Sequence, residues 1–517
     1  MKITKLILIT ALLSQGVFAA TIKRGLGPEP DSLDIHQAQG LPAIQVLREI
    51  REGLTSFDVS GNIIAGVAAS WEVLDDARTY RFEIRENARW SNGDAITAED
   101  FVRAWHRALT PATLARTASL LAPVVNVREA MTGEMGVESV GIKALSPTSL
   151  EIRLQSASPW FLEILAHPVS FPLHQERLDK PLQAPVNGAF MIENATLQAM
   201  IRLKKNPHFH AADSVALDTV EYLPIEDPTS ELSRFRAGEL DMTETIPSGR
   251  HDWLKTYMGN ELRVSPYIGS FWLGLNLGRD PFAENVELRR ALSLAIDRKI
   301  IARLVVGAGE MPAWSIVPPG IDGYTPQAFE GSELDKENRE REAKRLYTQA
   351  GYGDNKPLLI ELRYNTSSQH RKIALAVSSM WRQVLGVETT LINEEWKVFV
   401  NNRRQGVLTQ VFRGGWIADY ADPSSFLDLF RSDNELNTTF YRNEQFDRLM
   451  DQTGLLKGAE RMQRLQRAEI ELMKDMPVIP LYFYVSRHLV KPGVSGFQAN
   501  ARDIHLSRYM GVKSTSP

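Results

Sequence analysis

Cysteine is absent from the 517-residue sequence. Its absence excludes disulfide bonds, catalysis by a thiol, cysteine-ligated metal sites and a lipid anchor on an amino-terminal cysteine. A strong excess of either charge is also missing, because 59 basic and 63 acidic residues give a formal net charge of -4. No block of lysine and arginine and no RNA-recognition pattern marks a phosphate-binding surface, so we expect no nucleic-acid partner.

The common catalytic motifs are missing as well. The sequence has no G-x-S-x-G elbow, no H-E-x-x-H, no G-x-x-x-x-G-K-[ST] loop and no G-x-G-x-x-G fingerprint. His208 and His210 form the only close histidine pair, in a polar setting that is more typical of a loop than of a metal site. We therefore expect no enzyme activity, no bound metal and no cofactor.

The first nineteen residues differ in kind from the rest of the chain. Two lysines precede the apolar run Leu6 to Leu13, and Val17-Phe18-Ala19 offers small residues for cleavage. The run is shorter than the roughly 20 apolar residues that span a bilayer. We interpret residues 1–19 as a secretory signal peptide, cleaved near Ala19 or Ala20. Without a lipidated cysteine the protein is expected in a periplasm, and full secretion is the alternative.

Apolar periodicity predicts a mixed α/β protein. Residues 79–85 alternate between apolar and charged side chains, and residues 150–154 repeat the pattern, which is typical of half-buried strands. Between them Thr97 and Asp100 form a capping pair for a helix with an apolar face around Trp105. At about 100 to 200 residues per domain, the length predicts more than one domain.

The second half of the chain has a β-α-β-α-β rhythm, which predicts a parallel sheet built by right-handed crossovers. Because functional residues gather beyond the carboxyl ends of such strands, the stretch 413–423 is the first candidate site. No long linker is present, so we expect strands that cross between lobes. The predicted elements are a strand at 358–364, a helix ended by Gly386, a strand at 387–392, a helix near 397–404 and a strand at 407–413.

Several motifs follow one another along most of the chain, at residues 66–71, 79–82, 88–93, 97–101, 187–190, 236–241 and 289–298. In this order they resemble the extracellular solute-binding proteins of family 5, the peptide and nickel type. Three later motifs are Tyr364-Asn365-Thr366-Ser367, Glu395-Trp396-Lys397 and Arg413-Gly414-Gly415-Trp416-Ile417-Ala418-Asp419-Tyr420. These three are most similar to the members that bind oligopeptides and murein peptides.

The resemblance implies an α/β periplasmic binding protein fold of type II, cluster C, which is a three-domain bilobal fold with a hinged ligand cleft. The implied partners are short peptides and the inner-membrane permease of an ABC importer, and the implied state is a monomer. The expected domains are a discontinuous domain I at 20–51, 173–268 and 485–517, domain II at 52–172 and domain III at 269–484.

The family's peptide-binding mode implies a role for ten residues. A peptide's backbone adds as a strand, with Leu41, Gly415 and Ile417 in positions like those of the family's backbone partners. Asp419 matches the residue that receives the peptide's ammonium group, although Asp-Tyr-Ala-Asp-Pro also reads as a turn.

The other six residues concern the carboxylate and the side chains of the peptide. Arg413, His370 and Arg403 resemble the family's carboxylate contacts for ligands of different lengths. Arg403 lies beside Arg404, so a solvated face is the alternative, and His370 also reads as an ordinary surface histidine at a helix start. Three aromatic residues are expected either to wall side-chain pockets or to fill a core: Trp396, Trp416 and Tyr484.

Departures from the family pattern bear on specificity. Val306 stands in place of a lysine near the mouth of the site, and Thr117-Ala118-Ser119 in place of a pocket tyrosine. Gly269 and Ile417 stand where the general oligopeptide binder has a disulfide, and here the chain is more similar to the murein-peptide binder. Murein peptides are therefore the alternative ligand, and a non-peptide solute on the same scaffold is a further one.

Overall fold

The computed structural model describes residues 20–38, 40–176, 183–407, 409–418, 420–434, 436–454 and 456–513, apart from three side chains, those of Asp76, Trp396 and Lys397. The predicted signal peptide and Asp419 therefore lie outside the described residues. Across the described residues, no helix has the length and apolar character needed to cross a membrane.

A four-stranded sheet near the amino terminus has the strand order β1-β10-β9-β8, with β1 parallel to β10 and the other pairs antiparallel. Helix α1 follows β1 in the chain, and α5 and α6 follow β10. The bounds are β1 (Thr21–Gly25), α1 (Leu41–Ile50), β8 (Phe190–Thr196), β9 (Met200–Lys205), β10 (Thr219–Leu223), α5 (Pro228–Arg236) and α6 (His251–Tyr257).

A second four-stranded sheet, with the order β4-β5-β7-β6, is antiparallel. It confirms the two alternating strands, and the predicted capping pair opens α2, where Thr97 N donates to Asp100 Oδ2 at 2.9 Å. The bounds are β2 (Thr55–Phe57), β3 (Ile63–Ala65), β4 (Ala68–Leu74), β5 (Thr79–Ile84), α2 (Ala98–Leu109), α3 (Val127–Thr132), β6 (Ile142–Ser146), β7 (Ser149–Arg153) and α4 (Phe161–Ile164).

The third sheet has six strands in the order β12-β16-β11-β15-β13-β14. Strands β13, β14 and β15 are parallel, as predicted, whereas β11 and β16 are antiparallel to their neighbours. The strands are β11 (Leu262–Leu275), β12 (Met311–Pro312), β13 (Leu359–Asn365), β14 (Glu388–Glu394), β15 (Val411–Ile417) and β16 (Val478–Leu489). The helices are α7 (Val286–Leu294), α8 (Arg298–Ile300), α9 (Lys336–Gln349), α10 (Ser368–Leu385), α11 (Trp396–Gln405), α12 (Ser424–Leu427), α13 (Glu444–Thr453) and α14 (Gly458–Asp475), and a ribbon of β17 (Val494–Ser495) and β18 (Gly511–Val512) follows.

The last predicted strand is misplaced by four residues: it was expected at 407–413, and β15 runs from Val411 to Ile417. Two consecutive glycines, a residue type that is depleted in strands, follow the point where the predicted strand ended. In the sheet they allow close packing, because a Cβ atom at Gly414 would overlap the Trp272 ring, and one at Gly415 would lie 2.9 Å from Tyr484 Oη. The candidate residues from Arg413 to Ile417 therefore lie within a strand and not beyond its end.

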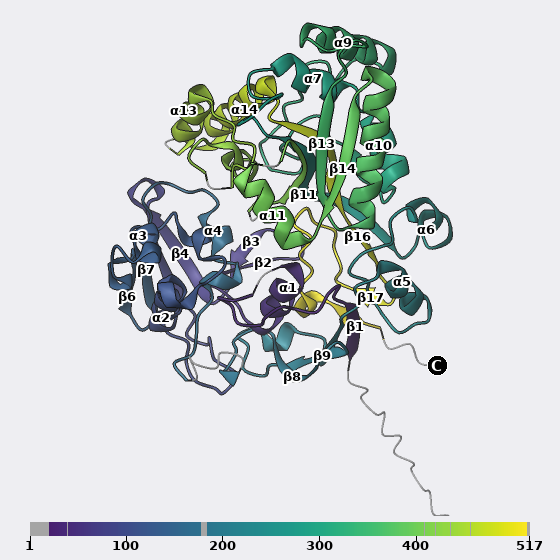
Figure 1. The fold of residues 1–517 in the computed structure, drawn as a ribbon. Coiled ribbons are helices and arrows are strands. Elements are labelled where there is room, and N and C mark those ends of the chain that lie inside the picture. Colours follow the sequence, from purple (N-terminus) through teal and green to yellow (C-terminus); the bar gives the residue numbers. More distant parts are fainter. Residues whose placement is uncertain are drawn as a thin grey trace, which may run out of the picture.

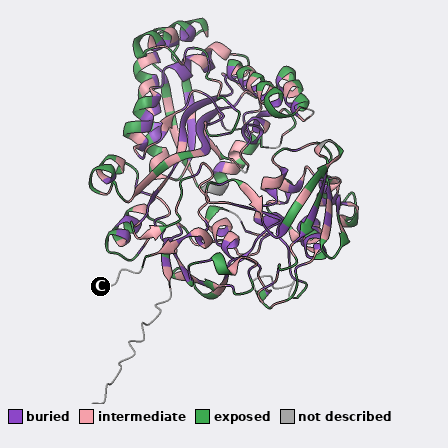
Figure 2. Cartoon of the chain, turned by 180° about the vertical axis from the view of Figure 1, so that it is seen from behind, coloured by how far each residue is buried: buried purple, intermediate pink, exposed green. Residues whose placement is uncertain are grey.

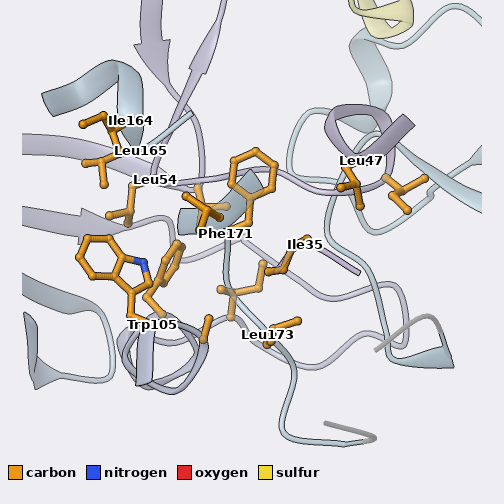
Figure 3. Close-up of a cluster of buried hydrophobic side chains, with 14 of the residues drawn as sticks. Ile35, Leu47, Leu54, Trp105, Ile164, Leu165, Phe171 and Leu173 are labelled. Atoms are coloured by element: carbon orange, nitrogen blue, oxygen red, sulfur yellow. The ribbon is translucent and has the colours of Figure 1, made fainter. Parts of the chain in front are cut away.

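Two large hydrophobic cores divide the molecule into two lobes (Figure 1). One core joins the two four-stranded sheets, and Figure 3 shows part of it, with Trp105, Leu47 and Phe171 contributed by separate segments. The other core lies against the six-stranded sheet, whose strands are mostly buried (Figure 2). The three-domain division stays a prediction.

Two long strands run between the lobes. Strands β11 and β16 pair from Leu262↔Leu489 to Gly274↔Val478, with the register interrupted between Pro266 and Ser270. In Figure 1 the yellow β16 passes from the six-stranded sheet down toward α5 and β17. Paired backbone thus connects the lobes, as the lack of a long linker predicted.

Candidate functional site

One edge of strand β15 carries backbone groups that no described strand uses. Ala418 N donates to Ile268 O, and Asn276 N donates to Gln410 O, so the even-numbered residues of β15 face β11. In an antiparallel pair the facing alternates, and the N–H and C=O groups of Gly415 and Ile417 therefore point away from β11. On that side β13 pairs with β15 only at Val411 and Phe412.

Three basic side chains predicted from the sequence come together beside this edge. We call His370, Arg403 and Arg413 the cation cluster. Arg413 Nε donates to Asn365 Oδ1 at 2.7 Å, and the guanidinium groups of Arg413 and Arg403 lie 5.7 and 5.6 Å from the centre of the Phe399 ring. No sequence motif had indicated that Phe399 and Asn365 contact these arginines.

Burial disfavours the charged form of each member of the cation cluster. Burial, followed by the charge of Arg413, lowers the pKa of the His370 imidazole to about 4, so that this ring is neutral near pH 7. Burial and then Arg413 and Arg404 lower the pKa of Arg403 to about 10, and burial also lowers the pKa of Arg413. Two buried polar atoms of the cluster, His370 Nδ1 and Arg403 Nε, have no hydrogen-bond partner among the described residues. The cluster is therefore suited to an anion.

His370 lies where the sequence placed it, in the first turn of α10. The hydroxyl of Ser367 caps this helix by accepting from His370 N at 3.3 Å. The imidazole ring lies 5.6 Å from the ring of Phe271 on β11. The histidine side chain is half-buried, and its role as a ligand contact stays a prediction.

Aromatic side chains surround the same stretch of β15. Tyr484 of β16 packs edge-on against Phe271 and Tyr482, with ring centres 6.4 and 5.6 Å apart. Trp416 Nε1 donates to Ser425 Oγ at 3.3 Å. Trp416 also lines a hollow of about 510 Å³ that Arg403, Arg404 and Phe412 share. Trp396 is the first residue of α11, and its side chain is not among those described.

A second hollow, of about 540 Å³, lies next to Leu41, the first residue of α1. Leu41 is 48% exposed and contributes to the lining together with Tyr267 of β11. Polar residues from distant segments complete the wall, and sequence reasoning identified none of them: Arg48, Glu49, Glu244, His488, Arg502, Asp503 and His505.

Among the described residues, one group has ligand atoms close enough to hold a metal ion, namely His488, Asp503 and His505, within 4.8 Å of one another. The contacts of these atoms fit a hydrogen-bonded ion pair. His488 contacts Thr243 O through Nδ1 at 2.9 Å and Asp503 Oδ1 through Nε2 at 2.7 Å, which needs both ring nitrogens protonated. Burial would lower the pKa of His488, but Asp503 raises it to about 9. In the pair His208 and His210, the Nε2 atom of His210 contacts Glu52 Oε2 at 2.7 Å.

The segment after β15 contacts its own sheet before position 419 and the other lobe after it. Ala418 continues the pairing with β11, and the Tyr420 ring stacks on Trp160 with centres 5.0 Å apart. Ala421 N donates to Glu163 Oε2 at 2.8 Å, and Glu163 also pairs with Arg502 at 2.7 Å. Asp419 itself lies outside the described residues, so its role stays a prediction.

Comparison with known proteins gives consistent matches. The family model described as bacterial extracellular solute-binding proteins, family 5 Middle, matches residues 62–438. The periplasmic oligopeptide-binding protein OppA of Salmonella typhimurium is 38% identical over 490 residues, which cover 92% of this chain and 89% of that protein. The periplasmic murein peptide-binding protein MppA of Escherichia coli is 34% identical over 499 residues, which cover 95% and 92%.

A solved structure has the same overall fold. The complex of Haemophilus influenzae OppA with RPPGFSPFR superposes with a TM-score of 0.82 at 32% identity, and the match covers 96% of this chain and 99% of that one. This likeness confirms the predicted α/β periplasmic binding protein fold.

Proposed function

Because the chain belongs to the bacterial extracellular solute-binding proteins of family 5, we propose that it binds short peptides between its lobes and delivers them to an ABC importer. It acts in the periplasm, after removal of residues 1–19, as a binding protein with no catalytic step. The observation that carries the proposal is the unpaired edge of β15 beside the cation cluster. The two features match the two parts that all peptides share, a backbone and charged ends.

The backbone of the peptide pairs with β15. Gly415 and Ile417 present N–H and C=O groups on the side that β13 leaves unpaired, and an extended peptide can add there as a further strand. Leu41 approaches from α1 and completes the backbone contacts. Main-chain pairing does not depend on side chains, which suits a receptor for peptides of varied sequence.

The charged ends of the peptide fix its direction and length. Asp419 accepts hydrogen bonds from the ammonium group, and the cation cluster receives the carboxylate, with His370, Arg403 and Arg413 serving ligands of different lengths. Arg403 has a buried Nε without a hydrogen-bond partner among the described residues, and a carboxylate would satisfy it. Charge pairs of this kind strengthen when closure removes water from the site.

Side chains of the ligand occupy the hollows beside β15. Trp416, Trp396 and Tyr484 wall these spaces with apolar surface. Arg403 and Arg404 both line the hollow at Trp416, which favours a ligand with a further carboxylate. Since MppA is named for murein peptides, a murein tripeptide is the second candidate ligand.

Closure moves one lobe against the other. We infer that residues 269–484 rotate as domain III against domain I (20–51, 173–268 and 485–517) and domain II (52–172). The separate core of the six-stranded sheet supports this division. The hinge is the point where the pairing of β11 with β16 is interrupted, between Pro266 and Ser270.

Calorimetric titration tests the proposal. The purified mature protein is titrated with a pool of tri- to pentapeptides, an N-acetylated copy of the pool, and murein tripeptide. We expect saturable binding that acetylation weakens by at least about thirtyfold, because it removes the partner of a buried charge. Asp419→Ala should have the same effect on the free peptides, whereas the exposed Asp354→Ala should have none.

The ligand with the highest affinity in this series shows whether the protein prefers general oligopeptides or murein peptides. Peptide binding that acetylation leaves unchanged would contradict ammonium capture by Asp419. An absence of heat from every peptide would overturn the peptide assignment and direct attention to non-peptide solutes.

A further inference from the structure

The hollow of about 540 Å³ beside Leu41 adjoins the stretch of β15 that we assign to the ligand backbone. Its wall includes Tyr267 on β11, two residues before Gly269, and Gly269 is the cross-strand partner of Ile417. Leu41, to which we also assign a backbone contact with the ligand, lines the same hollow, so a side chain of the bound peptide can enter it. The charged groups of the wall determine which kind of side chain can bind in the hollow.

Two carboxylates of this wall have unused acceptor capacity among the described residues. Glu49 is 1% exposed, and its Oε1 accepts from Tyr222 Oη at 2.8 Å and Ser507 N at 2.9 Å, while Oε2 is buried with no hydrogen-bond partner. No described donor forms a hydrogen bond or ion pair with the Glu244 carboxylate. Burial raises the pKa of Glu244 to about 7, which means that burial disfavours its carboxylate form. A cation bound next to Glu244 would stabilise the carboxylate.

The two cations that act on Glu244, Arg24 and His488, form ion pairs with other carboxylates. Arg24 pairs with Glu49 at 3.3 Å, and His488 pairs with Asp503 at 2.7 Å. His505 adds no charge near pH 7, because burial lowers its pKa to about 4. The wall holds the carboxylates Glu49, Glu244 and Asp503, and among the described residues Glu244 is the one of the three without an ion-pair partner.

The two arginines of the lining, Arg502 and Arg48, contact groups other than Glu244. Arg502 donates to both carboxylate oxygens of Glu163, at 2.7 and 3.3 Å. Arg48 Nε donates to Ala166 O at 3.4 Å, and its guanidinium lies 5.3 Å from the centre of the Phe57 ring. Neither forms an ion pair with Glu244 among the described residues.

We propose that this hollow is a subsite for a basic side chain of the bound peptide, with Glu244 and the free Oε2 of Glu49 as its acceptors. A lysine ammonium has three N–H donors and an arginine guanidinium has five, which can satisfy both carboxylates at once. Leu41, Ile44 and Tyr267 offer apolar surface for the methylene groups of such a side chain. The inference rests on the proposed function and narrows it to peptides with a lysine or arginine near the amino end.

The test compares lysine with norleucine, which has a chain of similar length and no charge. Tripeptides of alanine with either residue at the first, second or third position are titrated into the wild-type protein, Glu244→Gln and the control Glu226→Gln, whose side chain is exposed. At one position we expect the wild-type and the control to bind the lysine peptide about tenfold or more tightly than its norleucine counterpart. Glu244→Gln should reduce this ratio to near one and leave the affinity for the norleucine peptide unchanged.

The outcomes separate this inference from the proposed function. A ratio near one at every position in the wild-type protein overturns the basic subsite while peptide binding stands. A ratio that persists in Glu244→Gln with wild-type thermal unfolding overturns the role of Glu244. Failure of all the tripeptides to bind, with lysine and norleucine alike, contradicts the proposed function instead.

Discussion

His370, which is half-buried, and His488, which is buried, show how a single neighbour decides the charge of a side chain. His370 faces Arg413, and burial together with this positive charge lowers its pKa to about 4. His488 is buried as well, but Asp503 outweighs the effect of burial and raises its pKa to about 9. Near pH 7 the first ring is neutral in the candidate site, and the second is a cation that ties β16 to the carboxyl-terminal segment.

The charge of His488 makes stability depend on pH. Because its folded pKa of about 9 exceeds the unfolded value near 6.5, its contribution is complete below pH 6.5 and is lost as the pH rises through 9. We expect His488→Gln to lower the free energy of unfolding by roughly 2 to 3 kcal/mol more at pH 6 than at pH 10. Urea unfolding at both pH values measures this difference. An equal loss at the two pH values would show that His488 acts by packing alone.

At the scale of elements, strand β15 combines an open backbone edge with two glycines. Gly415 faces Tyr484, and a Cβ atom there would lie 2.9 Å from Tyr484 Oη and 3.2 Å from Ser270 O. Because Gly415 has no side chain, Tyr484 can lie close to β15, and the edge of β15 stays accessible. The same glycines hid the strand from sequence analysis, since glycine is depleted in strands.

Substitution of Gly415 tests the importance of this edge. We expect Gly415→Ala to displace Tyr484 and to weaken peptide binding by about tenfold, or roughly 1.4 kcal/mol. The matched control is Gly493→Ala, because a Cβ atom at Gly493 has no atom within 4 Å. Calorimetry compares the two variants, and thermal unfolding confirms that both are folded. Unchanged affinity in Gly415→Ala would argue against a ligand on this edge.

At the scale of the whole molecule, a small contact joins the lobes next to the proposed ammonium site. Glu163 of α4 pairs with Arg502 at 2.7 Å and accepts from Ala421 N at 2.8 Å, while Trp160 stacks on Tyr420. The contact connects the lobe of the four-stranded sheets to the segment that follows β15. It therefore favours the arrangement in which the two lobes are close together.

Loss of this contact should shift the molecule toward a more open form. We expect Glu163→Gln to weaken peptide binding by about three- to tenfold through faster dissociation, because a neutral amide is a weaker acceptor for Ala421 N than the carboxylate that Arg502 holds in place. Glu151→Gln, which affects an exposed pair with Arg81 in the same lobe, should leave affinity unchanged. Stopped-flow dissociation rates and small-angle X-ray scattering measure the two effects. Equal dissociation rates in both variants would rule out a role for Glu163 in closure.

The local sequence pattern determined several helices and strands of this protein. The alternation in β5, the capping pair of α2 and the parallel order of β13, β14 and β15 depend on residues close together in the chain, and the sequence predicted all of them. The family motifs also identified His370, Arg403 and Arg413, which the structure brings into one cluster.

Only the tertiary structure decided the rest. The end of β15 is set by its pairing with β11, which lies more than a hundred residues earlier in the chain. The hollow at Glu244 is assembled from α1, β11, β16 and the segment 502–506, so no single stretch of sequence could reveal a carboxylate without a partner. Periodicity is a property of neighbours in the chain, whereas charge state and cavity shape depend on neighbours in space.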